Sequence, residues 1–154
     1  MIKLGIVGDI GSGKSYVAKK FGFPVFNADH EVANIYKKNQ TCFKKIKKVL
    51  PKYINSFPIK KNEIINSIIA NKSNLKKITK IVHIEVKKNL NKFLKKNKNN
   101  NIVVLDIPLL LENKINKNND VLVFVDAKKK DIIKRLKKRK HFNLELFKRF
   151  KKIQ

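Results

Sequence analysis

Apolar residues follow two kinds of pattern along this chain. Four short segments rich in apolar residues predict strands, at residues 2–7, 24–27, 102–105 and 121–125. The last two are near-continuous apolar runs, which is typical of strands covered on both faces of a parallel sheet. Between residues 41 and 96, apolar residues instead recur every three or four positions, which predicts amphipathic helices.

Two shorter helical patterns, at residues 30–37 and 131–140, alternate with the predicted strands. This alternation predicts an α/β fold with a parallel sheet and a helical insertion after the second strand. At 154 residues the chain is long enough for one domain with a substantial core. We expect the core in residues 1–38 and 100–154, and the helical insertion at about 39–99.

The loop after the first predicted strand reads Gly-Asp-Ile-Gly-Ser-Gly-Lys-Ser at residues 8–15 and matches the phosphate-binding pattern G-x-x-x-x-G-K-[ST]. A helical pattern follows, so backbone N–H groups and a helix N-terminus would surround an anion. Lys14 is expected to reach the β- and γ-phosphates of a nucleoside triphosphate, and the Ser15 hydroxyl to bind Mg²⁺. The alternative is a glycine-rich turn that binds nothing. The predicted nucleotide-binding residues in this segment are Gly8, Gly11, Ser12, Gly13, Lys14, Ser15 and Tyr16.

The net charge of +27 does not by itself indicate a nucleic-acid partner. Nearly all the excess is lysine, which is abundant together with asparagine and isoleucine, as expected from A/T-rich codons. Arginine forks and interleaved aromatic residues would be more typical of a nucleic-acid surface. No apolar stretch approaches the ~20 residues needed to span a bilayer, and no secretory signal opens the chain. The single Cys42 fits a reducing cytoplasm, where we expect it to be a small apolar helix residue.

Acidic residues are scarce, and several follow the predicted strands. Asp29 follows the second strand, at the edge of a parallel sheet where ligands bind. It is a candidate general base for an attacking hydroxyl, and it could also cap the next helix. Asp106 ends the third strand and is a candidate Mg²⁺ ligand. Asp126 likewise comes at the end of an apolar strand and is a second candidate for this role, although its position before a helical pattern favours a capping role.

Three segments resemble one enzyme family. Residues 8–15 resemble the loop G-G-I-G-S-G-K-S of the dephospho-coenzyme A kinases, with Asp9 at the second position. Residues 25–29 (Val-Phe-Asn-Ala-Asp) resemble the family's V-I-D-A-D, with Asn27 in place of the first aspartate. Residues 106–112 (Asp-Ile-Pro-Leu-Leu-Leu-Glu) resemble D-x-P-L-L-F-E, the most family-specific of the three.

The resemblance extends to further candidate residues. His83 stands where the family has a His-Pro pair and is a candidate substrate ligand, although a lone histidine among apolar residues is more often a packing residue. Arg135 and Arg139 lie one helical turn apart, as in the helix that leads to the family's lid. Their guanidinium groups suit bidentate contact with phosphate, Arg135 for nucleotide binding and Arg139 for catalysis. The residues expected at the acceptor substrate are Asp29, His83, Pro108, Leu109 and Glu112.

Similarity to this family implies a three-layer P-loop kinase fold and an inserted helical subdomain that binds the acceptor. It also implies ATP- and Mg²⁺-dependent phosphorylation of the ribose 3′-hydroxyl of dephospho-CoA in the cytoplasm, with Asp29 as the base. A shikimate-kinase-like enzyme and a non-catalytic ATP-binding module are the alternatives. The oligomeric state is left open.

The family continues beyond the position of Gln154 through another strand, an asparagine near the adenine and a closing helix. The resemblance therefore implies a chain truncated at its C-terminus. We expect such a chain to hold ATP weakly and to discriminate poorly between ATP and GTP.

Overall fold

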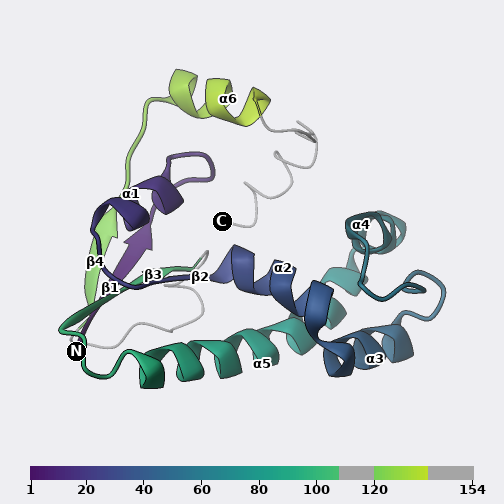
Figure 1. Cartoon of the computed structure of the whole chain (residues 1–154). Coiled ribbons are helices and arrows are strands. Elements are labelled where there is room, and N and C mark those ends of the chain that lie inside the picture. The colour runs from purple at the N-terminus through teal and green to yellow at the C-terminus, as the bar shows by residue number, and fades with distance from the viewer. Residues whose placement is uncertain (108–119, 139–154) are drawn as a thin grey trace. The chain divides into compact units, whose positions relative to one another are not determined.

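The computed structural model describes residues 1–107 and 120–138. Strands and helices alternate at the start of the chain, and four successive helices then follow the second strand, as Figure 1 shows. In chain order, the described elements are β1 (Ile2–Val7), α1 (Lys14–Lys20), β2 (Val25–Asn27), α2 (Ala28–Lys38), α3 (Gln40–Val49), α4 (Lys61–Ala70), α5 (Ser73–Lys96), β3 (Ile102–Asp106), β4 (Val121–Phe124) and α6 (Lys129–Lys137).

The four described strands form one sheet in the order β2-β3-β1-β4. Every pairing is parallel: Ile2 lies opposite Ile102, Gly5 opposite Leu122, and Asn27 opposite Asp106. A parallel sheet has all its carboxyl ends at one edge, so the segments that follow the four strands start from the same edge. The α/β fold and the parallel sheet expected from the apolar runs are confirmed.

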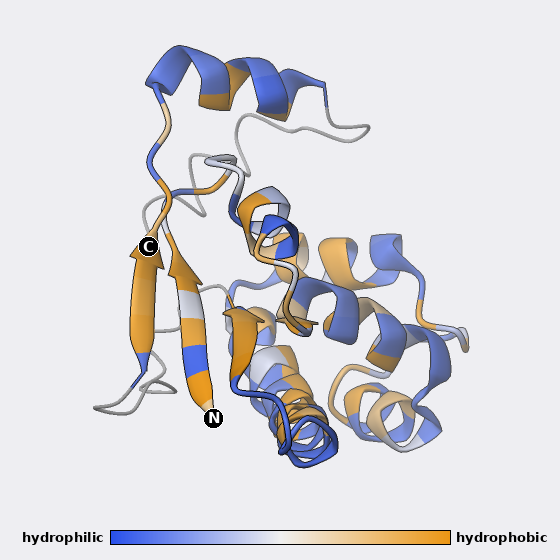
Figure 2. Cartoon of the chain, turned by 60° about the vertical axis from the view of Figure 1, so that its left-hand side comes forward, coloured by the Kyte–Doolittle hydropathy of each residue, from blue (hydrophilic) through white to orange (hydrophobic). Residues whose placement is uncertain are grey.

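The sheet is apolar along its length, and Figure 2 colours most strand residues as hydrophobic. Ile6 and Val104 from the two central strands are fully buried against Ala18 of α1. Successive residues of β3, Val103, Val104 and Leu105, are all buried, so this strand is covered on both faces, as its near-continuous apolar run predicts. The packing fixes α1, and with it the loop that joins β1 to α1, against the carboxyl end of β1.

The chain divides into two compact units. One comprises residues 1–27 and the described part of 97–154, and contains the sheet; the other is the helical unit, Ala28–Lys96. The helical unit therefore begins at Ala28 rather than near residue 39, because α2 packs against α5 and α3.

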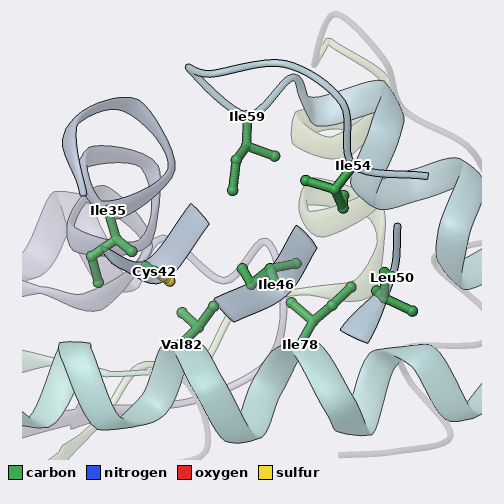
Figure 3. Close-up of a cluster of buried hydrophobic side chains, with 8 residues drawn as sticks. All are labelled: Ile35, Cys42, Ile46, Leu50, Ile54, Ile59, Ile78 and Val82. Atoms are coloured by element: carbon green, nitrogen blue, oxygen red, sulfur yellow. The ribbon is translucent and has the colours of Figure 1, made fainter. Parts of the chain in front are cut away.

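The helical unit has its own core, shown in Figure 3. Ile78 and Val82 of α5 point toward Ile46 of α3, which is fully buried. Burial, and to a smaller extent the nearby Glu85 carboxylate, raises the pKa of the Cys42 thiol to about 11. Because a neutral thiol is a poor nucleophile, Cys42 is the inert apolar residue that the sequence predicts. The buried members of this cluster are Ile35, Cys42, Ile46, Leu50, Ile54, Ile59, Ile78 and Val82.

Two helix starts differ from the sequence prediction. α2 begins at Ala28, directly after β2, so that Asp29 lies within its first turn instead of before it. α6 begins after Lys128, and the Asp126 carboxylate accepts a hydrogen bond from the neighbouring Ala127 N–H at 2.8 Å. The expected capping role of Asp126 is wrong, because its side chain is held by its own loop. Within the described residues, no helix combines the length and apolarity needed to cross a bilayer.

We expect Ile46→Ala to lower the free energy of unfolding by ~2–5 kcal/mol, because it leaves a cavity in the core of the helical unit. Ile69→Ala is the matched control: the same atoms are removed from a side chain that is 62% exposed. That variant should stay within about 1 kcal/mol of the parent, helped by the higher helix propensity of alanine. Urea denaturation followed by circular dichroism measures both, and equal losses would contradict the core described for this unit.

Candidate functional site

The loop between β1 and α1 is shaped by three glycines with positive φ. Gly8, Gly11 and Gly13 have φ of 139°, 86° and 107°, a region that side chains disfavour. Space is also short: a Cβ on Gly8 would overlap the Val125 carbonyl oxygen. A Cβ on Gly11 would lie 3.1 Å from both Ile132 Cγ2 and Leu136 Cγ of α6. The loop therefore runs closely between the end of β4 and α6, and glycine is required for both reasons.

The polar groups of the loop are arranged as a phosphate cradle. The Lys14 ammonium donates to the carbonyl oxygens of Gly8 at 2.6 Å and Asp9 at 2.8 Å, which holds the side chain back across the loop. Ser12 is 4% exposed, and its Oγ has no hydrogen-bond partner among the described residues. Leaving a buried hydroxyl unpaired costs about 1–3 kcal/mol. A phosphate oxygen in the loop would supply an acceptor for this hydroxyl, so the residues fit the expected ligand.

Arg135 ties α6 to the loop. Its guanidinium donates to the carbonyl oxygen of Ser12 at 2.7 Å and reaches that of Gly11 at 3.5 Å. Both contacts come from one nitrogen, Nη1, whereas a guanidinium carries five N–H groups in all. The side chain is therefore beside the phosphate loop, and its described contacts are to the loop itself.

The two predicted Mg²⁺ ligands are linked through a third residue. The Asn27 amide nitrogen donates to Asp106 Oδ2 at 2.5 Å and lies 3.4 Å from Ser15 Oγ. Asp106 is 3% exposed, at the end of β3, and Ser15 lies in the first turn of α1. Mg²⁺ in nucleotide sites takes one or two protein oxygens and completes its octahedron with water and phosphate oxygens. The Asp106 carboxylate and the Ser15 hydroxyl, which both contact the Asn27 amide, would supply these two protein oxygens.

Sequence reasoning missed the role of Asn27. It treated this position as the loss of a carboxylate, whereas the structure shows an amide in contact with both predicted metal ligands. The signal was present in the sequence: Asn27 ends a strand, as Asp106 does, and parallel strands bring such ends together. Among the described residues, no group of three or more His, Cys, Asp or Glu side chains could hold a metal ion.

Two further candidates belong to the helical unit. Asp29 lies in the first turn of α2, two residues after Asn27, and its side chain is exposed. His83 is exposed on α5, so it is not the buried packing residue that its apolar neighbours suggested.

The other candidates are at the loop or outside the described residues. Tyr16 is 68% exposed, and the Lys20 ammonium lies 5.5 Å from the centroid of its ring. The predicted site residues outside the described part of the chain are Pro108, Leu109, Glu112 and Arg139.

Comparison with known proteins gives a consistent result. The family model for dephospho-CoA kinase matches residues 2–154. The dephospho-CoA kinase of Wolbachia from Brugia malayi is 33% identical over 129 residues, which cover 80% of this chain and 66% of that protein. The dephospho-CoA kinase of Fusobacterium nucleatum is 32% identical over 158 residues, which cover 98% of this chain and 80% of that protein.

The fold comparison agrees. A crystal structure of a protein from Thermus thermophilus superposes with a TM-score of 0.80 at 26% identity, covering 99% of this chain and 80% of that one. The chain thus spans about two thirds of the length of several curated relatives, such as the Wolbachia protein at 66%. Since the family model matches nearly every residue and the loop and sheet edge have the geometry described above, the chain belongs to the dephospho-CoA kinase family.

Proposed function

We propose that this chain catalyses the ATP-dependent phosphorylation of the ribose 3′-hydroxyl of dephospho-CoA, the last step of coenzyme A synthesis. The observation that carries the proposal is the phosphate loop of a chain in the dephospho-CoA kinase family. The loop holds the Lys14 ammonium and a buried Ser12 hydroxyl that has no partner within residues 1–107 and 120–138. A loop of this form binds the phosphates of a nucleotide through backbone N–H groups, the lysine and the helix N-terminus.

Lys14 would leave the two loop carbonyls and contact the β- and γ-phosphates, because phosphate oxygens are charged acceptors and the carbonyls are neutral ones. At that position its charge would offset the charge that develops on the transferred phosphoryl group. Ser15 and Asp106 would hold Mg²⁺, which supplies electrostatic stabilisation of the phosphates when it is bound.

Asp29 would accept the proton of the attacking hydroxyl. It follows Asn27 by two residues in the chain, and Asn27 lies beside Ser15 and Asp106. His83, Pro108, Leu109 and Glu112 would line the acceptor site, and Arg139 would assist at the transferred phosphate. The reduced, buried Cys42 is consistent with a reaction in the cytoplasm.

We expect dephospho-CoA to be phosphorylated by this chain with ATP and Mg²⁺, while shikimate and AMP are not. For each of the three acceptors, chromatography measures the consumption of ATP and the formation of the phosphorylated acceptor, which is CoA when dephospho-CoA is the substrate. Phosphorylation of shikimate instead of dephospho-CoA would support the shikimate-kinase-like alternative. ATP binding without turnover of any acceptor would leave only an ATP-binding module and would contradict the proposed function.

Asp29→Asn should lower kcat by ~10²–10⁴ at saturating substrates, because the amide cannot accept the hydroxyl proton. Glu31→Gln is the matched control, since both carboxylates lie in the first turn of α2 and both favour its helix dipole. The control should keep kcat within about threefold. A glutamine oxygen can still accept the hydrogen bond that Asn89 donates to Glu31 at 2.9 Å, and loss of a helix-dipole charge is worth only tenths of a kcal/mol. Equal losses in the two variants would show that Asp29 acts through helix stability rather than as the base.

Gly11→Ala should weaken ATP binding by ~10-fold or more, since overpacking of this kind typically costs 1–3 kcal/mol. The new methyl group would meet Ile132 and Leu136 in addition to the strain of a φ of 86°. Gly22→Ala is the control for backbone strain without crowding. Gly22 has a φ of 72°, and a Cβ at that position would have nothing within 4 Å. Calorimetric titration with ATP should find the control unchanged; a matching loss there would mean that backbone strain alone is responsible.

A further inference from the structure

The contact among Asn27, Ser15 and Asp106 goes beyond the assignment of metal ligands. Asn27 and Asp106 are paired residues at the carboxyl ends of β2 and β3. Neighbouring residues in register on parallel strands direct their side chains to the same face of the sheet. The strand register therefore places the amide beside the carboxylate, and no rearrangement of a loop is needed to bring them together.

The chemistry of the pair fixes which amide atom faces Asp106. An ionised carboxylate can only accept hydrogen bonds, so the NH₂ group of Asn27 must face it, and the structure has that arrangement at 2.5 Å. The same NH₂ group carries a second hydrogen, and Ser15 Oγ lies 3.4 Å away. The bond to Asp106 is thus short and the contact with Ser15 is at the long end of the hydrogen-bond range.

These bonds leave the metal-binding atoms of both ligands available. Asp106 uses Oδ2 for the amide, so Oδ1 keeps its lone pairs. Ser15 Oγ has two lone pairs, and the contact with Asn27 uses one of them. Since Asp106 is 3% exposed, water has little access to orient the carboxylate in place of the amide.

We propose that Asn27 is a positioning residue for the Mg²⁺ of the ATP complex, and that it orients Asp106 and Ser15 through its single NH₂ group. The proposal rests on the proposed function only in taking Mg²⁺·ATP as the ligand of the loop. Partners that orient metal ligands typically change metal affinity by ~10–100-fold when they are removed. Because the amide is neutral, Asp106 supplies the single negative charge of this trio of side chains.

The experiment measures the dissociation constant of ATP twice, in EDTA and in saturating Mn²⁺ as the probe metal. The ratio of the EDTA value to the Mn²⁺ value reports what the metal ligands add to ATP binding. Asn27→Leu removes both hydrogen bonds at similar volume and should lower this ratio by ~10-fold. Asn27→Asp replaces the donor with a charged acceptor: ATP binding in EDTA should weaken and the ratio should rise, because a second carboxylate attracts the cation and repels the triphosphate.

Matched controls are available in the same unit. Asn99→Leu and Asn99→Asp make the same changes at an exposed residue just before the amino end of β3, the opposite edge of the sheet. Both controls should keep the parent ratio. If Asn27→Leu fails to fold, Asn27→Ala takes its place, because it also removes both hydrogen bonds and adds no charge.

A role in packing alone would weaken ATP binding equally with and without Mn²⁺, so that the ratio for Asn27→Leu stays within about twofold of the parent. That result, or a parent ratio of one, would overturn the proposal. No acceptor enters the measurement. Failure of dephospho-CoA turnover therefore contradicts the proposed function but not the role of Asn27. An unchanged ratio contradicts the role of Asn27 but not the proposed function.

Discussion

The parallel register of the sheet is the constraint on which the candidate site depends. β3 lies between β2 and β1, so the residue that ends β3, Asp106, has the end of β2 on one side and the phosphate loop on the other. A shift of one residue in the pairing of β2 with β3 would send the Asn27 side chain to the opposite face of the sheet. Phe26 of β2 is 3% exposed, between two less buried neighbours. Its side chain resists such a shift, because the shift would turn it away from the core and expose apolar surface. Packing in the sheet thus holds the polar groups at its edge.

The closeness of α6 to the loop adds a second constraint. Ile132 and Leu136 approach Gly11, and Arg135 donates to the loop carbonyls from the same helix. Apolar contact sets the distance between helix and loop, and the guanidinium sets their orientation. The loop conformation is therefore determined by residues more than a hundred positions away in sequence, as well as by its own glycines.

Much of this arrangement was predictable from sequence because it depends on local patterns. The strands follow from short apolar runs, and the loop from a motif in which each glycine has a conformational reason. The site residues at strand ends follow from a general property of parallel sheets. What escaped prediction depends on pairing between distant segments. The contact of Asn27 with Asp106 requires knowing that β2 pairs with β3, and the loop contact of Arg135 requires knowing where α6 packs. The start of the helical unit at Ala28 likewise follows from the packing of α2 on α5, which no local pattern specifies.

The separate core of the helical unit has a consequence for how the chain unfolds. All eight buried residues of that cluster come from the continuous stretch Ala28–Lys96, whereas Ile6, Ala18 and Val104 bury themselves with the sheet. Local opening follows the boundaries of such clusters, so amide hydrogen exchange should fall into two groups with different protection. Cooperativity then belongs to each unit, and a single melting temperature would average two equilibria. A substitution can in this way loosen the helices while the sheet and its phosphate loop keep their protection.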